Sequence, residues 1–329
     1  MKKTTLNSTL VSFMVFLAAV VPRLEAAETK YPSRPIRFVV PFPPGGTNDT
    51  LARIIGPKLT DSMGQTWVVD NRGGGGGNLA IEVVATAQPD GHSVLLGLNT
   101  ALTANPALYP NLPFNIMADL QPITKLASAQ FILVAHPSIQ ASNLNEFIAL
   151  VKSMPGKLNY ASAGVGSPLH LAAEMFKFRT NTDIVHVPYR GGGPAATAVL
   201  AGEVQALFGS VAATLPHVKA GRLKAFAVTG LKRSAVAPNL PTIAQSGFPG
   251  FEVTSWYSLL VRAKTPRPIV KRLYDEAVHA VMLNDVQEAF GRQGLGIETS
   301  ANPEQLASQI KSETGIWAKV ISGAGIKAD

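Results

Sequence analysis

The sequence predicts an α/β protein of two lobes, each with a mostly parallel β-sheet flanked by helices, joined by two crossing strands. A short apolar strand, a Gly- or Ser-rich loop and an amphipathic helix recur along the chain, which is typical of parallel sheets covered by helices. The strand-forming stretches fall into two clusters, one before about residue 127 and one between about 130 and 250. The 329 residues, 46% of them hydrophobic, are enough to build two cores.

The first cluster predicts three strands, over 36–40, 67–69 and 93–98. Apolar residues between 51 and 59 share one helical face, and Pro57 should bend or interrupt that helix. A second helix is predicted over 78–88, where the turn Pro89-Asp90-Gly91 ends it.

The second cluster begins with a helix over 143–154, for which Ser142 or Asn143 is the N-cap. Four further strands and three connecting helices follow in alternation. The strands are expected over 158–162, 184–188, 204–209 and 223–229, with helices that start near Ser167, Pro194 and Thr214.

The final segment predicts a strand over 254–261 and helices over 267–283, 285–293 and 303–319. We expect this segment to fold back on the first cluster. Residues 28–128 together with 252–329 then form lobe 1, and residues 129–251 form lobe 2. A single large sheet is the alternative.

Residues 1–27 have the pattern of a signal peptide. Lys2 and Lys3 precede an apolar run over 10–21, and the small residues Ala26 and Ala27 offer a cleavage site. The alternative is a membrane anchor, but this run is shorter than the roughly 20 residues that span a bilayer. We therefore expect export, cleavage near Ala26 or Ala27, and a periplasmic mature protein.

Composition excludes several classes of function. The chain has no Cys, which excludes a disulfide scaffold, a thiol nucleophile and Cys-ligated metals. The net charge of +8 is spread along the chain and is not interleaved with aromatic residues, so we expect no nucleic-acid partner. The glycine run over 73–77 fails the dinucleotide spacing at Asn78, and no metal-ligand spacing or nucleophile–base pair is evident. We expect no cofactor, no metal and no catalytic residue.

The loop after the first strand is the first candidate binding element. Gly45 and Gly46 let a ligand oxygen approach the unpaired N–H groups where the next helix begins, and Thr47 adds a hydroxyl. Asp49 either caps this helix or contacts the ligand; both interpretations stay open.

A second loop of this kind covers 160–170 and also joins a strand to a helix. Ser162 and Ser167 offer hydroxyl groups, while Gly164 and Gly166 expose the backbone. His170 lies one turn into the helix and either supports the loop or touches the ligand. Neither loop contains Lys or Arg, so N–H and O–H groups would hold an anion such as a carboxylate between lobes that close.

Seven motifs in register resemble the substrate-binding proteins of tripartite tricarboxylate transporters, the Bug family. The resemblance covers the chain from about Tyr31 to its end. The motifs are P-F-P-P-G-G-T-N-D-T-L-A-R (41–53), V-V-D-N-R-G-G-G-G-G-N (68–78), Q-P-D-G-H (88–92), S-A-G-V-G-S-P-L-H-L (162–171), V-P-Y-R-G-G-G-P-A (187–195), L-P-H-V-K-A-G-R-L-K-A-F-A-V-T (215–229) and L-P-T-I-A-Q-S-G-F-P-G-F-E (240–252).

This resemblance implies a Venus-flytrap periplasmic binding protein of type II-like fold, without catalysis and monomeric. Such proteins capture a small mono- or dicarboxylate, aromatic acids included, and deliver it to integral-membrane permease subunits. Two alternatives remain: a sensor that presents its ligand to a membrane receptor, and an exported hydrolase. Carried over by position, the ligand-binding residues are Gly45, Gly46, Thr47 and Asp49 on one side and Ser162, Gly164, Gly166 and Ser167 on the other.

The chain also departs from this family. Relatives often have an Asp after the Phe of the strand near 208, where this chain has Gly209 followed by Ser210. We expect this change to alter which groups of the protein contact the far end of the ligand. From their loop positions, the residues expected around that end are Phe42, Thr100, Ala101, Tyr189, Ser210 and Trp256.

Overall fold

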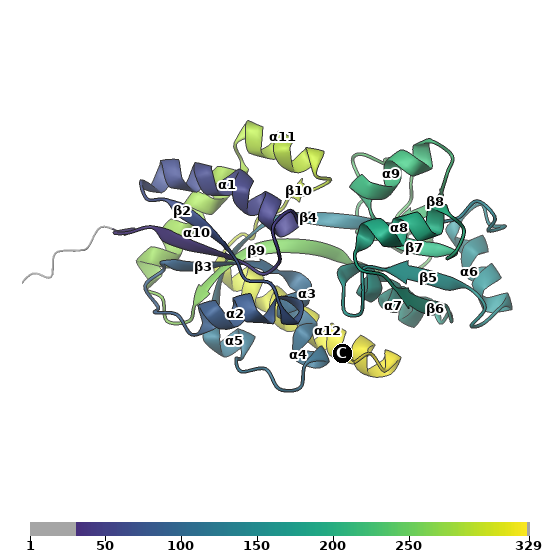
Figure 1. Cartoon of the computed structure of the whole chain (residues 1–329), viewed down its shortest axis with the longest axis horizontal. Coiled ribbons are helices and arrows are strands. Elements are labelled where there is room, and N and C mark those ends of the chain that lie inside the picture. The colour runs from purple at the N-terminus through teal and green to yellow at the C-terminus, as the bar shows by residue number, and fades with distance from the viewer. Residues whose placement is uncertain (1–30, 328–329) are drawn as a thin grey trace, which may run out of the picture.

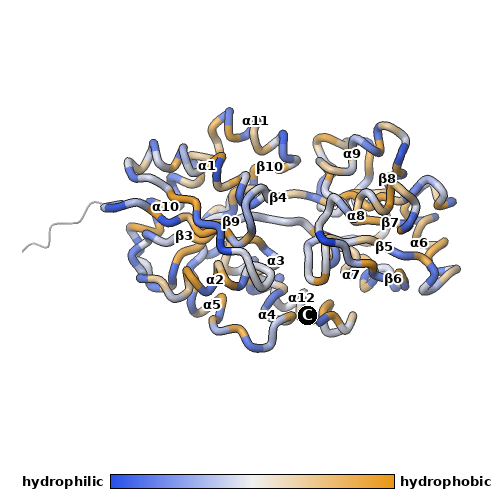
Figure 2. Tube along the Cα trace, viewed as in Figure 1, coloured by the Kyte–Doolittle hydropathy of each residue, from blue (hydrophilic) through white to orange (hydrophobic). Residues whose placement is uncertain are grey.

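The protein consists of two lobes side by side along its longest axis, as a computed structural model that describes residues 31–327 shows (Figure 1). Hydrophobic segments follow the strands of both lobes (Figure 2). Two sheets form the centres of these lobes, and backbone hydrogen bonds connect one sheet to the other.

The first sheet is built around β1 (Ile36–Val40), which pairs in parallel with β2 (Trp67–Asn71) and β3 (Ser93–Leu98). The antiparallel strand β9 (Thr254–Arg262) then pairs with β3. The helical elements of this first lobe up to β4 (Leu120–Ala135) are α1 (Thr47–Met63), η1 (Gly75–Gly77), α2 (Asn78–Ala85), α3 (Asn99–Thr103), α4 (Asn105–Leu108) and α5 (Ile116–Asp119).

The second sheet has parallel pairs of β5 (Asn159–Ser162) with β6 (Val185–Pro188) and with β7 (Ala206–Ser210). A further strand, β8 (Lys224–Val228), pairs antiparallel with β4 (Leu120–Ala135). Its helical elements are α6 (Leu144–Ser153), α7 (Pro168–Thr180), α8 (Gly192–Leu200), α9 (Val211–Lys219) and η2 (Ala244–Ser246).

One strand belongs to both sheets. The 16 residues of β4 (Leu120–Ala135) pair with β9 from Leu120 to Gln130 and with β7 from Phe131 to Ala135. Backbone hydrogen bonding is therefore continuous, as the single-sheet alternative requires, but the side chains pack into separate cores. Together, β4 and β9 are the crossing strands between the lobes (Figure 1).

The C-terminal segment returns to the first sheet and then reaches beyond it. Helices α10 (Arg267–Val281) and α11 (Asn284–Arg292) and the short β10 (Gly296–Ile297) belong with the first lobe. Helix α12 (Pro303–Ala324) buries Leu306 and Ile310 in the first lobe, whereas its Trp317 packs in the core of the second. The domain boundaries read from the sequence stay a prediction, and α12 contributes to both cores.

The predicted α/β class is confirmed by the strand–helix units of each lobe, in which the strands pair in parallel. Helix α1 continues through Pro57 without interruption, and α2 ends at Ala85, three residues earlier than expected. The α6 cap is Asn143, whose side chain accepts a hydrogen bond from the N–H of Glu146. The predicted signal peptide lies outside the described residues. No helix within residues 31–327 is long and apolar enough to cross a bilayer.

Candidate functional site

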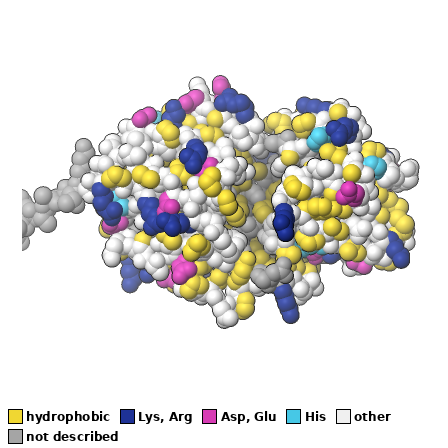
Figure 3. Space-filling view, in the orientation of Figure 1, with side chains coloured by type: hydrophobic (Ala, Val, Ile, Leu, Met, Phe, Trp, Pro, Cys, Tyr) yellow, Lys and Arg dark blue, Asp and Glu magenta, His cyan; other side chains and the backbone are white. Residues whose placement is uncertain are grey.

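A groove of about 660 Å³ lies between the two lobes. Figure 3 shows this hollow, with hydrophobic side chains on both of its walls. The crossing strands contribute to its lining as well, through Gln130 and Phe131 of β4 and Ser255 and Tyr257 of β9. Both loops proposed from the sequence reach the groove, from opposite sides.

The first loop places the start of α1 at the groove. Gly46 is the N-cap of α1, and Thr47 and Asn48 of the first turn line the groove. Gly45 adopts a φ of +88°, a left-handed conformation that favours glycine. The turn thereby brings backbone N–H groups, which the helix itself does not use, close to the space between the lobes.

Asp49 stabilises this loop from within. Its Oδ2 accepts hydrogen bonds from the N–H of Gly45 (3.0 Å) and from Nε of Arg53 (2.9 Å). The hydrogen bond from Arg53 is the main cause that lowers the pKa of the Asp49 carboxyl group. Asp49 is buried and does not line the groove, and its carboxylate binds the N–H of Gly45, the residue before the N-cap of α1.

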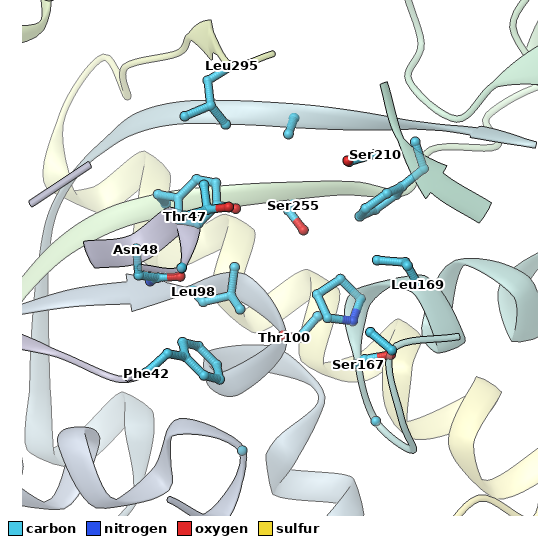
Figure 4. Close-up of a pocket in the computed structure, with 18 of the residues that line it drawn as sticks. Phe42, Thr47, Asn48, Leu98, Thr100, Ser167, Leu169, Ser210, Ser255 and Leu295 are labelled. Atoms are coloured by element: carbon cyan, nitrogen blue, oxygen red, sulfur yellow. The ribbon is translucent and has the colours of Figure 1, made fainter. Parts of the chain in front are cut away.

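The second loop places the start of α7 on the opposite side. Ser167 is the N-cap of α7, where its Oγ accepts a hydrogen bond from the N–H of His170 (3.3 Å). Its hydroxyl hydrogen remains available as a donor. Gly166 and Ser167 both line the groove. Figure 4 shows Ser167 on this side of it.

A buried stack of rings supports the second loop from behind. The ring of His186 lies between those of Tyr160 and His170, with centroid separations of 4.9 Å and 4.0 Å. Ser162 Oγ lies 2.5 Å from Nε2 of His186 and accepts the N–H of Gly164. Burial is the first cause that lowers the pKa of His170, to about 3, and burial lowers the pKa of His186 as well. Ser162 and His170 therefore stabilise the loop and do not line the groove.

The residues proposed from the sequence separate into two groups. Those that line the groove are Phe42, Gly46, Thr47, Thr100, Gly166, Ser167 and Ser210. Those that lie behind or beside the lining are Gly45, Asp49, Ala101, Ser162, Gly164, His170 and Tyr189. Trp256 is also absent from the lining, because its Nε1 donates to Glu313 of α12 (2.9 Å). Their roles in binding remain predictions.

Several lining residues were missed by the sequence analysis. Asn48 is only 4% exposed, and its Nδ2 has no hydrogen-bond partner among the described residues. Its place beside Thr47 in the first loop was a usable signal. No local signal marks Ser255 or Tyr257, because they reach the groove through the pairing of β9 with β3 and β4. Burial raises the pKa of Tyr257 to about 12, so this residue contributes a neutral hydroxyl group.

Every described residue that lines the groove is uncharged. The N-termini of α1, α7 and α9, hydroxyl groups and side-chain amides therefore supply the polar contacts. Helix N-termini favour anions, because their free N–H groups carry partial positive charge. Residues 31–327 contain no cluster of three or more His, Asp or Glu side chains that could hold a metal ion. The site can hold a small anion by hydrogen bonds alone.

Two α/β lobes joined by crossing strands, with an anion-compatible groove between them, define a two-lobed binding protein. The family model described as tripartite tricarboxylate transporter family receptor matches residues 51–326. The chain belongs to this family of receptors. Family and fold are those of substrate-binding proteins.

Curated relatives support the assignment along most of the chain. The UPF0065 protein in the tcbD-tcbE intergenic region of Pseudomonas sp. (strain P51) is 41% identical over 293 residues, which is 88% of this chain and 86% of the relative. Protein BugT of Bordetella pertussis is 34% identical over 314 residues, covering 95% and 96% of the two chains.

Solved structures agree with the fold. R. palustris Rpa4515, solved with adipate, has a TM-score of 0.77 at 31% identity and covers 90% of this chain and 99% of its own. MatC (Rpa3494) from Rhodopseudomonas palustris, solved with bound malate, has a TM-score of 0.74 at 32% identity, covering 88% and 100%. The periplasmic binding protein BugD has a TM-score of 0.74 at 33% identity, covering 91% and 100%.

Proposed function

We propose that this protein is a periplasmic receptor that captures a small carboxylate between its lobes and delivers it to a membrane permease. The family and the carboxylates bound by two structural relatives support this proposal. The observation that carries it is the arrangement of Thr47 and Ser167, which line one groove from the first turn of α1 and the N-cap of α7.

The chemistry of these two turns suits a carboxylate headgroup. Its oxygens accept hydrogen bonds only, and the turns offer backbone N–H groups together with the hydroxyl groups of Thr47 and Ser167. A ligand that bridges both lobes makes all of these contacts only when the groove is closed. Binding then shifts the population of the protein toward its closed form.

Delivery to a permease and export by the predicted leader complete the proposal. BugD is a periplasmic binding protein, and a further structural relative is a periplasmic transporter. N-terminal sequencing of the protein recovered from periplasmic extracts is expected to begin after Ala26 or Ala27. An intact leader in that fraction would contradict cleavage.

The decisive experiment is a thermal-shift screen of small carboxylates followed by calorimetry with Ser167→Ala. A carboxylate ligand raises the melting temperature, because it binds the native state. Ser167→Ala removes a hydrogen bond to a charged group, so we expect a loss of about 1.5–3 kcal/mol, roughly ten- to 150-fold in Kd.

The matched control is Asn143→Ala. Asn143 caps α6 as Ser167 caps α7, but it does not line the groove. Both variants should lose about 1 kcal/mol of stability through the missing cap. Only Ser167→Ala should bind the carboxylate more weakly; equal affinities in the two variants would contradict a role of Ser167 in binding.

A further inference from the structure

The second lobe carries most of the excess positive charge of the described chain. Residues 129–251 contain 10 Lys and Arg residues against 4 Asp and Glu residues, a net charge of +6 with His neutral. The other described residues, 31–128 and 252–327, contain 15 against 14, a net charge of +1. Opposite charges therefore nearly cancel in the first lobe, whereas the second lobe is basic.

One of these cations, Arg190, lies beside the second binding loop. The preceding residue Tyr189 donates its backbone N–H to the carbonyl oxygen of Ser162 (3.0 Å), where this loop begins. On the other side, a Cβ atom at Gly192 would lie 3.7 Å from Cδ2 of Leu169, which lines the groove. The Arg190 side chain is exposed and does not line the groove itself, so it stands at the rim.

A second cation, Lys232, stands at the rim next to the crossing strand β4. Its carbonyl oxygen accepts a hydrogen bond from Nε2 of Gln130 (3.0 Å), which lines the groove. Three residues earlier, Thr229 donates its N–H to the carbonyl oxygen of Phe131, another lining residue. The side chain of Lys232 is exposed, and residues 228–251 around it contain no Asp or Glu.

The charge of these two residues is not compensated by a described carboxylate. Among residues 31–327, Lys177 is the only Lys or Arg of the second lobe that forms an ion pair. In the first lobe, by contrast, Arg53 of α1 and Arg72 after β2 each form an ion pair with an Asp. Figure 3 shows basic side chains beside the hollow on the second lobe. The positive potential at the mouth of the groove therefore comes mainly from Arg190 and Lys232.

We propose that Arg190 and Lys232 steer anionic ligands into the groove, so that a carboxylate collects at the second lobe before the lobes close on it. This inference rests on the proposed function, because it concerns how a carboxylate reaches the site. The uncharged lining can hold an anion by hydrogen bonds, but it does not attract one from a distance. A unit positive charge about 10 Å away in water raises the local concentration of a monovalent anion roughly twofold.

The test measures association by stopped flow with malate, adipate and benzoate, and with any further acid found in the thermal-shift screen. Arg190→Glu combined with Lys232→Glu changes the rim charge by four units. For each acid that the parent binds, we expect kon to fall at least about threefold at about 0.01 M ionic strength, with koff nearly unchanged. The difference in kon should disappear near 1 M salt, where the Debye length is about 3 Å. Arg190→Gln combined with Lys232→Gln changes half as much charge and should show about half the effect on log kon.

The matched control is Lys157→Glu combined with Arg222→Glu, which changes the net charge equally. Both side chains are exposed, and they precede β5 and β8, two strands that run toward the groove, so they lie at the far end of the lobe. The control should lower kon less than about twofold, because the greater distance weakens the interaction.

The outcomes separate this inference from the proposed function. Equal slowing in the rim variant and the control, or a rim variant with the parent's kon, overturns the inference and leaves the proposed function standing. A raised koff with an unchanged kon overturns it as well, because the two residues would then hold the ligand and not steer it. If no carboxylate of the screen binds to the parent, the proposed function fails, and the inference fails with it.

Discussion

The backbone N–H of Gly166 donates a hydrogen bond to Nδ1 of His170, 3.0 Å away. This bond requires Nδ1 to be unprotonated, because only the bare ring nitrogen accepts. The second binding loop is therefore held by a buried, neutral imidazole. Protonation would remove the acceptor at a position where water cannot easily replace it.

Stability should consequently fall in mild acid. The pKa of His170 is about 3 in the folded protein, lowered first of all by burial, against about 6.5 in an unfolded chain. Between these values the unfolded chain binds a proton that the folded chain does not. The contribution is thus fully present above about pH 6.5 and is lost as the pH falls toward 3. At pH 4.5 the loss reaches about 2.7 kcal/mol from this group.

Urea denaturation at pH 7 and pH 4.5 measures this effect in the parent protein and in His170→Asn. The Asn side chain keeps an acceptor near the position of Nδ1 but does not titrate, so the pH dependence should be flatter. His279→Asn changes an exposed His of α10 and should leave the pH dependence as it is. Equal slopes for the parent and His170→Asn would show that His170 is not the responsible group.

Asn48→Leu should have opposite effects on stability and binding. Asn48 Nδ2 is buried without a described partner, a cost that Leu of similar size removes, so the free protein should be as stable as the parent or more stable. Carboxylate binding should weaken by about 1–3 kcal/mol if this amide donates to the ligand. Thermal melts and calorimetry measure the two effects. Reduced stability together with an unchanged Kd would assign Asn48 a purely structural role.

Gly209→Ala should destabilise the second lobe. A Cβ atom at Gly209 would lie 2.2 Å from Cγ2 of Thr214, which is fully buried. Overpacking of this kind costs about 1–3 kcal/mol. Thr214→Ser removes that methyl group and keeps the hydroxyl group that donates to the carbonyl oxygen of Ser210.

The double variant tests this steric explanation. Gly209→Ala combined with Thr214→Ser should recover most of the loss, which a double-mutant cycle measures as coupling between the two sites. If the two substitutions lower the stability additively, the steric explanation is contradicted. Thr214 therefore fills the volume that a larger residue at position 209 would occupy.

Local patterns predicted the strand–loop–helix units well, because each unit carries its own apolar face and its own turn residues. The strand β4 was missed. Pro122 near its start, the polar Lys125 and the register shifts opposite β9 hide its pattern. Lys125 is buried there because it pairs with Glu298, which is distant in sequence. The helices α3 and α4 have only 5 and 4 residues, too few for a periodic signal.

The site was predictable where a single loop forms it. Thr47 and Ser167 line the groove as expected, since each begins a helix directly after a strand and its loop. Residues behind the loops, such as Ser162, cannot be distinguished from lining residues until their partners are known. Ser255 lies at the groove only because β9 pairs with β4, a distant part of the chain, and no local pattern encodes that pairing.

Helix α12 limits how far the lobes can travel apart. Its 22 residues are anchored by Leu306 and Ile310 at one end and by Trp317, Val320 and Ile321 at the other. A continuous helix resists stretching. A wide separation of the two lobes would therefore expose one of these groups of side chains or break the helix. Small rotations of the lobes that leave both groups of α12 side chains buried cost little free energy. The helix therefore limits how far the groove between the lobes can open.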